Sequence, residues 1–126
     1  MKVLDNEQMN GDSYNTPKWL MELFEGWFDP CEISIGELRM FDGLGSSWKD
    51  KTFVNPPYSD PLPWVLKGIE ENKKGKTIVF LLKLDCSTKW FMALKNANAH
   101  IILPNERIKY NGKTPAFSSM IAILSK

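Results

Sequence analysis

The stretch "KTIVFLLKL", residues 76–84, restricts the fold more than any other part of the chain. Its apolar residues are continuous, which is typical of a strand covered on both faces, because such a strand has no side that faces water. Patterns typical of helices lie on both sides of it, at 60–75 and 87–97. This alternation of helix and strand around a buried strand predicts an α/β sheet.

Residues that commonly begin or stop helices mark the ends of these two helices. Asp60 is the expected cap of the first, Pro61 lies in its first turn, and Gly75 stops it. Ser87 is the expected cap of the second.

An earlier helix is expected over residues 16–28, "TPKWLMELFEGWF", where apolar residues recur at helical spacing. Thr16 is its expected N-cap, and Pro17 its first helical residue, since a backbone N–H at that position has no partner within the helix. We expect the tryptophans on the apparent helix faces to pack in the core: Trp19, Trp27, Trp64 and Trp90.

The other expected strands are short. "TFV" at 52–54 ends at two prolines, which cannot donate to a β-ladder, and "HIILP" at 100–104 is a further strand. The segment 106–125 is expected to form two strands joined by a turn region that starts at Asn111-Gly112. Together these elements predict a mostly parallel sheet closed by a C-terminal antiparallel hairpin, with helices on both faces.

The composition predicts one soluble domain over residues 14–126, preceded by a loose polar segment at 1–13. Of the 126 residues, 43% are hydrophobic and 25% charged, and no apolar run is long enough to span a bilayer or to form a signal peptide. We therefore expect a cytoplasmic protein. Cys31 and Cys86 are expected to be reduced thiols, and a metal site is not expected in a chain with one histidine.

The tetrapeptide "NPPY" at 55–58 follows the first predicted strand, and in α/β sheets ligands bind beyond the C-terminal ends of strands. Asn55 offers a carbonyl acceptor, and Pro56 has a carbonyl but no N–H. Pro57 stiffens the segment, and Tyr58 adds a flat aromatic face.

Two fixed acceptors and a stacking surface suit a planar exocyclic amine such as that of adenine. The nitrogen of this amine is a poor nucleophile because its lone pair is delocalised into the ring. Acceptors that hold both N–H bonds out of the ring plane make the nitrogen more tetrahedral, so its lone pair can attack a sulfonium methyl group. Two alternatives remain open: a strand stop without function, and a proline-rich ligand for an aromatic groove.

The chain resembles the phage-type DNA N6-adenine methyltransferases, which are small S-adenosylmethionine-dependent enzymes with a Rossmann-like sheet. The resemblance covers residues 14–124. It is carried by "YNTPKWLMELFEGWFDPC", "FDGLGSSW", "FVNPPYSDPLPWVLKGIEENKKGKTIVFLLKLDCSTKWF" and "ERIKYNG". It implies an abridged Rossmann-like methyltransferase fold, an adenine-specific DNA methyltransferase activity, and a virus or integrated prophage as the source.

The resemblance also implies roles for individual residues. Asn55 and the Pro56 carbonyl match the pair that holds the target amine, and Tyr58 matches the residue that stacks on the flipped base. The residues that would border the S-adenosylmethionine cofactor are Thr16, Pro17, Asp29, Pro30, Cys31 and Asp42. Asp42 could equally be a turn residue, because a glycine follows it.

The family's larger relatives carry a glycine-rich turn after the first strand, whereas here "DPC" runs directly into "EISIGEL". Glu32 and Glu37 are the candidates for the carboxylate that binds the cofactor ribose. The short distance from Cys31 to Asp42 implies that the cofactor half is abridged or is completed by another chain, which would make a homodimer.

The chain has no room for a separate domain that recognises the DNA sequence, so loops at the strand ends would contact DNA. The candidates for contacts with phosphates are Lys89, Arg107, Lys109 and Lys113. A solvated basic surface is the alternative for these residues, since the net charge is only +1. Three other functions stay open: methylation of adenine in RNA, methylation of protein glutamine, and a degenerate methyltransferase fold that only binds nucleic acid or a partner.

Overall fold

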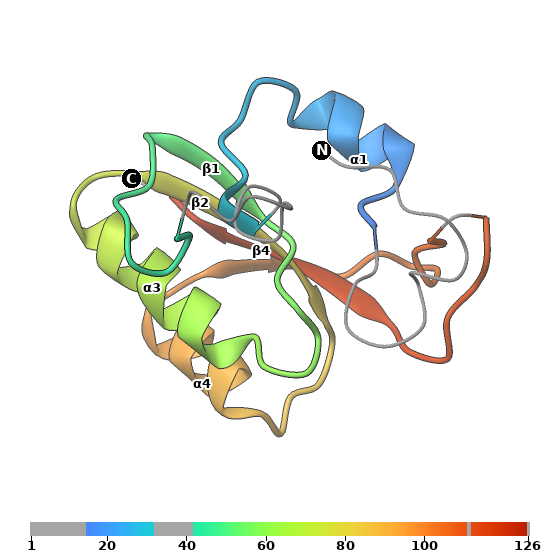
Figure 1. Cartoon of the computed structure of the whole chain (residues 1–126). Coiled ribbons are helices and arrows are strands. Elements are labelled where there is room, and N and C mark those ends of the chain that lie inside the picture. Colours follow the sequence, from blue (N-terminus) through green and yellow to red (C-terminus); the bar gives the residue numbers. More distant parts are fainter. Residues whose placement is uncertain (1–14, 32–41, 111, 126) are drawn as a thin grey trace.

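The computed structural model describes residues 15–31, 42–110 and 112–125. The expected loose segment at 1–13 lies outside these residues. A four-stranded sheet with the order β1-β2-β4-β3 forms the centre of the fold (Figure 1). Its strands are β1 (Lys51–Val54), β2 (Thr77–Lys83), β3 (His100–Ile102) and β4 (Ser119–Leu124).

Strand β2 lies inside the sheet and is buried on both faces, as its apolar run predicts. Ile78, Phe80 and Leu82 belong to one core cluster, and Val79 and Leu81 belong to a second cluster on the opposite face. Burial of side chains of this size stabilises a fold by roughly 1.5–3 kcal/mol each, so this strand contributes to the packing of both layers.

The prediction of a mostly parallel sheet is wrong, because β4 is inserted between β2 and β3. Strands β1 and β2 pair in parallel, whereas β4 pairs antiparallel with both β2 and β3. Strands β1, β2 and β3 therefore run in the same direction, as helical crossovers predict, and only β4 is reversed. The sheet is mixed because the one reversed strand, β4, lies inside it and forms two antiparallel pairs, which leaves β1 and β2 as the parallel pair.

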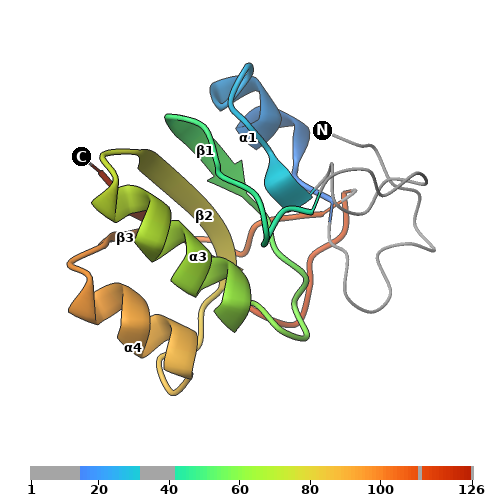
Figure 2. The ribbon, with the colours of Figure 1, turned by 60° about the vertical axis from the view of Figure 1, so that its left-hand side comes forward.

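Helices cover both faces of the sheet (Figure 2). Helices α3 (Leu62–Lys73) and α4 (Lys89–Asn96) pack on one face, and α1 (Lys18–Leu23) contributes Leu20 to the core on the other. Helix α3 approaches the sheet closely at Gly68, where a Cβ atom would lie 2.3 Å from Cζ of Phe80.

The expected caps of the first two helices are wrong. Pro17, not Thr16, is the N-cap residue of α1, and Pro61, not Asp60, is that of α3. Neither proline forms a side-chain cap hydrogen bond. The cause is steric, since a proline ring fixes φ near the helical value and can begin a helix without a polar cap.

The cap of α4 also differs from the prediction by one residue. Thr88, not Ser87, caps this helix, and its hydroxyl accepts a hydrogen bond from the backbone N–H of Phe91 at 3.2 Å. The Ser87 hydroxyl instead donates to the Asp85 carboxylate at 2.6 Å. Two adjacent hydroxyl residues offer alternative caps, and the chain uses the one nearer the helix.

The first strand of the expected C-terminal hairpin is absent from the described residues. Tyr110 and Lys113 form an isolated antiparallel bridge across the turn, and β4 follows only at Ser119. The intervening chain forms a loop rather than a ladder.

One of the four tryptophans departs from the expected packing. Trp64 and Trp90 are buried in the core, and Trp27 packs against the second cluster. Trp19, by contrast, is 51% exposed, so the prediction that it packs in the core is wrong. Among the residues that the structure describes, no helix is long and apolar enough to cross a membrane.

Candidate active site

The "NPPY" segment leaves the sheet at the C-terminal end of β1, as expected. Phe28 pairs in parallel with Thr52 on the outer side of β1, through hydrogen bonds of 3.0 Å to the Lys51 carbonyl and 2.8 Å from the Phe53 N–H. Asp29 therefore follows Phe28 at the same end of the sheet as Asn55. The two segments "DPC" and "NPPY", in which the sequence predicts site residues, therefore lie at the same end of the sheet.

Asn55 is held by Thr16, which is 39 residues away in the chain. The side-chain amide nitrogen of Asn55 donates a hydrogen bond of 3.0 Å to the Thr16 hydroxyl. Thr16 is buried and Asn55 is half-buried, so this bond is partly shielded from water and fixes the plane of the amide. The carbonyl oxygen of Asn55 then lies on the side of the amide group that is turned away from Thr16.

Tyr58 is held from the opposite side by a residue that the sequence did not single out. Its hydroxyl lies 2.9 Å from the hydroxyl of Tyr110, which is fully buried and lies 2.8 Å from the Ser119 hydroxyl at the start of β4. The Tyr58 ring also meets Phe117 edge-on at 5.3 Å between centroids. Tyr110 and Phe117 lie on either side of the expected turn at 111–112, and their aromatic character was the only sequence signal for their contacts with Tyr58.

The segment from Asp29 to Cys31 forms a capped turn. The Asp29 carboxylate accepts a hydrogen bond of 3.2 Å from the backbone N–H of Cys31, and the chain becomes helical at Pro30. Burial raises the pKa of the Cys31 thiol well above its usual value, and the nearby Asp29 charge raises this pKa further. A hydrogen bond from the Asn55 backbone opposes the rise, which places Cys31 beside Asn55.

Asp42 occupies the turn that the glycine after it predicts. Its carboxylate accepts a hydrogen bond of 3.1 Å from the backbone N–H of Leu44, and a Cβ atom on Gly45 would lie 2.4 Å from it. This turn leads to Trp48, which is buried, stacks on Trp64 at 6.4 Å between centroids and donates to the Gly43 carbonyl. The other acidic candidates, Glu32 and Glu37, lie outside the described residues.

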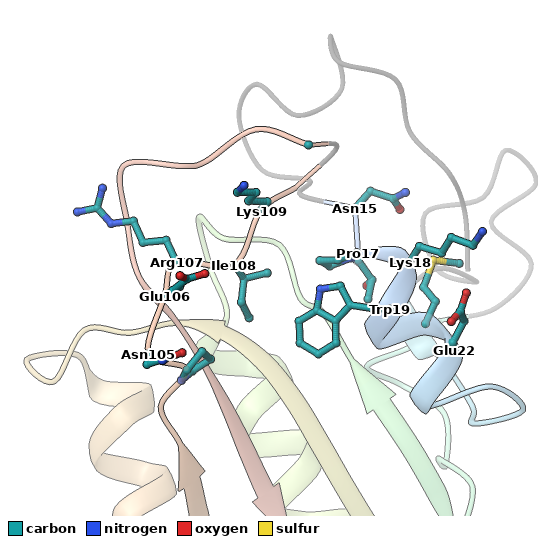
Figure 3. A pocket seen from close by; sticks show the side chains of 14 residues that line it. Asn15, Pro17, Lys18, Trp19, Glu22, Asn105, Glu106, Arg107, Ile108 and Lys109 are labelled. Atoms are coloured by element: carbon teal, nitrogen blue, oxygen red, sulfur yellow. The ribbon is translucent and has the colours of Figure 1, made fainter.

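A groove of about 1130 Å³ opens between α1 and the segment 104–109, with Gly112 also in its lining (Figure 3). Thr16 and Pro17 line it from one side, and Arg107 and Lys109 line it from the other. The structure thus brings together residues predicted to border the cofactor and residues predicted to contact DNA.

The remaining predicted residues lie in other places. Lys113 is exposed and pairs with Tyr110 in the same loop. Lys89 begins α4, on the other face of the sheet from α1, and is not brought together with Arg107 and Lys109.

Comparisons with known proteins support one family. The family model described as DNA N-6-adenine-methyltransferase (Dam) matches residues 39–120. The DNA N-6-adenine-methyltransferase of Haemophilus phage HP1 (strain HP1c1) is 32% identical over 125 residues, which cover 87% of this chain and 72% of that protein. The protein of the same name from Escherichia phage T1 is 29% identical over 104 residues, which cover 72% of this chain and 44% of that protein.

No solved structure matches the chain. The family model nevertheless covers more than half of the sequence, and it includes the whole segment from Asp42 through "NPPY" to the start of β4. The chain therefore belongs to the DNA N-6-adenine-methyltransferase (Dam) family.

Proposed function

We propose that this protein transfers a methyl group from S-adenosylmethionine to the exocyclic N6 amine of adenine in DNA. The observation that carries the proposal is the support of the "NPPY" segment from two sides, by Thr16 at Asn55 and by Tyr110 at Tyr58. Both relatives are phage proteins, so we place the activity in the cytoplasm of a phage host.

The proposed chemistry relies on preorganised acceptors rather than on a strong base. The carbonyl oxygens of Asn55 and Pro56 accept hydrogen bonds from the two N–H groups of the target amine. Pro57 keeps the segment rigid, and Tyr58 stacks on the base. Because Thr16 fixes the Asn55 amide, little reorganisation is needed when the amine binds. The amine proton leaves after the nitrogen has become cationic, so a weak acceptor suffices.

The residues at the end of the sheet fit a methyl donor that carries positive charge. Asp29 is partly exposed, follows Phe28 beside β1 and caps the turn at Pro30 and Cys31, so its carboxylate lies at the same end of the sheet as Asn55. Thr16 and Pro17 would hold the donor from the side of α1, and Asp42 would approach its adenine ring. When bound, S-adenosylmethionine supplies an electrophilic sulfonium methyl group.

The DNA would present its adenine outside the base stack, because the amine cannot reach Asn55 inside a duplex. Arg107 and Lys109 in the groove, with Lys113 in the same loop, are proposed to contact phosphates. Lys89 would contact DNA only if the DNA also extends past α4.

The test is transfer of a labelled methyl group from S-adenosylmethionine to DNA, RNA and glutamine-containing peptides. We expect adenine in DNA to be labelled. Asn55→Ala should lower the rate at least about 100-fold, since it removes an acceptor that acts on the transition state. Tyr58→Ala should lower it roughly 10-fold or more through lost stacking.

The matched control is Asn96→Ala, which removes an exposed amide at the end of α4 and should leave the rate unchanged. Labelling of peptide glutamine or of RNA, with DNA unlabelled, would reject DNA as the substrate. DNA binding without calorimetric binding of S-adenosylmethionine would reject the enzyme activity and favour a degenerate fold.

A further inference from the structure

The groove beside α1 shares its walls with the two sides of the candidate active site. Thr16, in one wall, is hydrogen bonded to Asn55 at 3.0 Å. Ile108 and Lys109, in the other wall, directly precede Tyr110, whose hydroxyl lies 2.9 Å from that of Tyr58. The groove therefore borders both supports of "NPPY", directly at Thr16 and next to Tyr110 in the chain.

An exposed indole stands between these walls. Trp19 comes from α1 and is 51% exposed, and Figure 3 shows its ring between Pro17 and Ile108. Leu20, the next residue, is fully buried against the sheet and so anchors the helix that carries Trp19. The position of the indole is thus set by the core, although the ring itself faces the groove.

Cationic side chains stand around this indole. Arg107 and Lys109 line the groove on one side and Lys18 on the other (Figure 3). Two carboxylates, Glu106 and Glu22, also line it, so the cations outnumber the anions only slightly. An aromatic face with cations near it is the usual way in which proteins bind single-stranded nucleic acid, where the ring stacks on a base and the cations meet the backbone.

We propose that this groove binds the nucleotide next to the target adenine on the same DNA strand, and that Trp19 stacks on its base. The inference rests on the proposed function, because it takes the target adenine to be at Asn55 and Tyr58. Stacking on a neighbouring base would hold the strand open on one side of the extruded adenine. Trp19 would then contribute to DNA affinity while making no contact with the reacting amine.

A second hollow, which shares Lys18, Met21 and Glu22 with this groove, suits the sulfonium end of the cofactor better than the groove does. Thr16 and Pro17, which are proposed to hold the donor, line the groove itself. Asp29 lines a hollow of about 380 Å³ at the other end of α1, together with Phe24 and Trp27. This carboxylate accepts a hydrogen bond from the backbone N–H of Cys31. The methyl donor, which is a cation at sulfur, fits the side that carries Asp29, whereas the phosphates of DNA fit the side that carries Arg107 and Lys109.

The experiment compares Trp19→Ala and Trp19→Phe with Leu23→Ala. Leu23 is a matched control, because it is an exposed apolar residue of the same helix, 67% exposed, and does not line the groove. Binding of a labelled single-stranded oligonucleotide is measured by fluorescence anisotropy at several salt concentrations. Binding of S-adenosylmethionine is measured by calorimetry.

We expect Trp19→Ala to weaken DNA binding about 10-fold and Trp19→Phe to weaken it less, while Leu23→Ala has no effect. The affinity for S-adenosylmethionine should not change. The measured slope is that of the logarithm of the binding constant against the logarithm of the salt concentration. Because stacking releases no counterions, Trp19→Ala should leave this slope unchanged, whereas Lys109→Ala should reduce its magnitude by about 0.7.

Two results would overturn the inference: unchanged DNA affinity in Trp19→Ala, or weaker binding of S-adenosylmethionine with DNA binding intact. The second result would assign the groove to the cofactor. Failure of the proposed function gives a different result from failure of this inference. In that case DNA binding depends on Trp19, but no methyl group is transferred.

Discussion

At the scale of single residues, the candidate site depends on side chains outside the "NPPY" segment. Thr16 fixes the amide of Asn55, and Tyr110 fixes the hydroxyl of Tyr58 while Ser119 fixes Tyr110 in turn. A phenol ring can rotate about its side-chain torsions, and each hydrogen bond restricts that rotation. The geometry of "NPPY" is therefore set by residues that are distant in sequence.

Removal of the Tyr110 hydroxyl tests this support. Tyr110→Phe keeps the buried ring but loses both hydrogen bonds, so we expect kcat/KM for DNA to fall about 5-fold, which corresponds to one hydrogen bond of about 1 kcal/mol. The fall should come mainly from KM, because a looser Tyr58 stacks less well on the base.

Ser119→Ala is the companion variant, since it leaves the pair of Tyr58 and Tyr110 intact. It should lower the melting temperature slightly and raise KM less than Tyr110→Phe does, because Tyr58 keeps its direct partner. Equal kinetics for Tyr110→Phe and the wild type would show that Tyr110 only fills the core.

At the scale of elements, a buried carboxylate attaches the segment before β1 to helix α3. Glu71 of α3 is fully buried and accepts hydrogen bonds from the backbone N–H of Trp48 at 2.7 Å, from Lys74 at 2.9 Å and from Lys76. Lys76 also donates to the Trp48 carbonyl. The turn that carries Asp42 leads directly into this contact, so Glu71 also restrains a proposed cofactor residue.

The ionisation of Glu71 predicts a loss of stability in acid. Burial by itself would raise the pKa of this carboxyl, but the hydrogen bonds from Lys76, Lys74 and Trp48 outweigh it and lower the pKa from 4.5 to about 2. A lowered pKa means that the stabilisation is complete above pH 4.5 and disappears as the pH falls towards 2.

Urea unfolding of Glu71→Gln tests this expectation. The variant should lose about 3 kcal/mol at pH 7, because the lysines lose a buried partner, and the difference from wild type should shrink below pH 4.5. Glu70→Gln is the matched control: this exposed neighbour pairs with exposed Lys73 at 3.7 Å and should change little. A Glu71→Gln effect that is constant from pH 7 to pH 2 would contradict the role of its charge.

At the scale of the whole molecule, local patterns predicted the elements but not their arrangement. The apolar run of β2, the prolines after β1 and the periodicity of α3 and α4 are local signals, and the structure confirms these elements. The insertion of β4 between β2 and β3 depends on contacts between distant segments, which periodicity does not report. The mixed sheet was therefore missed.

The candidate site, like the fold, could be predicted in its parts but not in the contacts between distant segments. The family resemblance and the rule that ligands lie beyond strand ends put Asp29 and Asn55 at the same end of the sheet, but the hydrogen bond between Thr16 and Asn55 was not predicted. The contact between Tyr58 and Tyr110 depends on the path of a long loop, and no local pattern contains that path. Periodicity likewise placed Trp19 and Leu20 on one apolar face, although only Leu20 turns towards the sheet.

The position of β4 predicts that the sheet cannot form without it. A chain that ends at residue 118 would leave β2 and β3 without their shared neighbour, so we expect it to show no cooperative urea transition. A chain that ends at residue 124 should unfold cooperatively and is the control. Cooperative unfolding of the shorter chain would show that β1 and β2 hold the core on their own.

The central position of β4 also has a consequence during synthesis. On the ribosome, β1, β2 and β3 emerge before β4, and until translation has passed Leu124 the nascent sheet has a gap at its middle. Ser119, which fixes Tyr110 and through it Tyr58, arrives with that same strand. Completion of the fold and alignment of the proposed base-binding tyrosine would thus be one event, so a partly made chain could neither fold nor methylate.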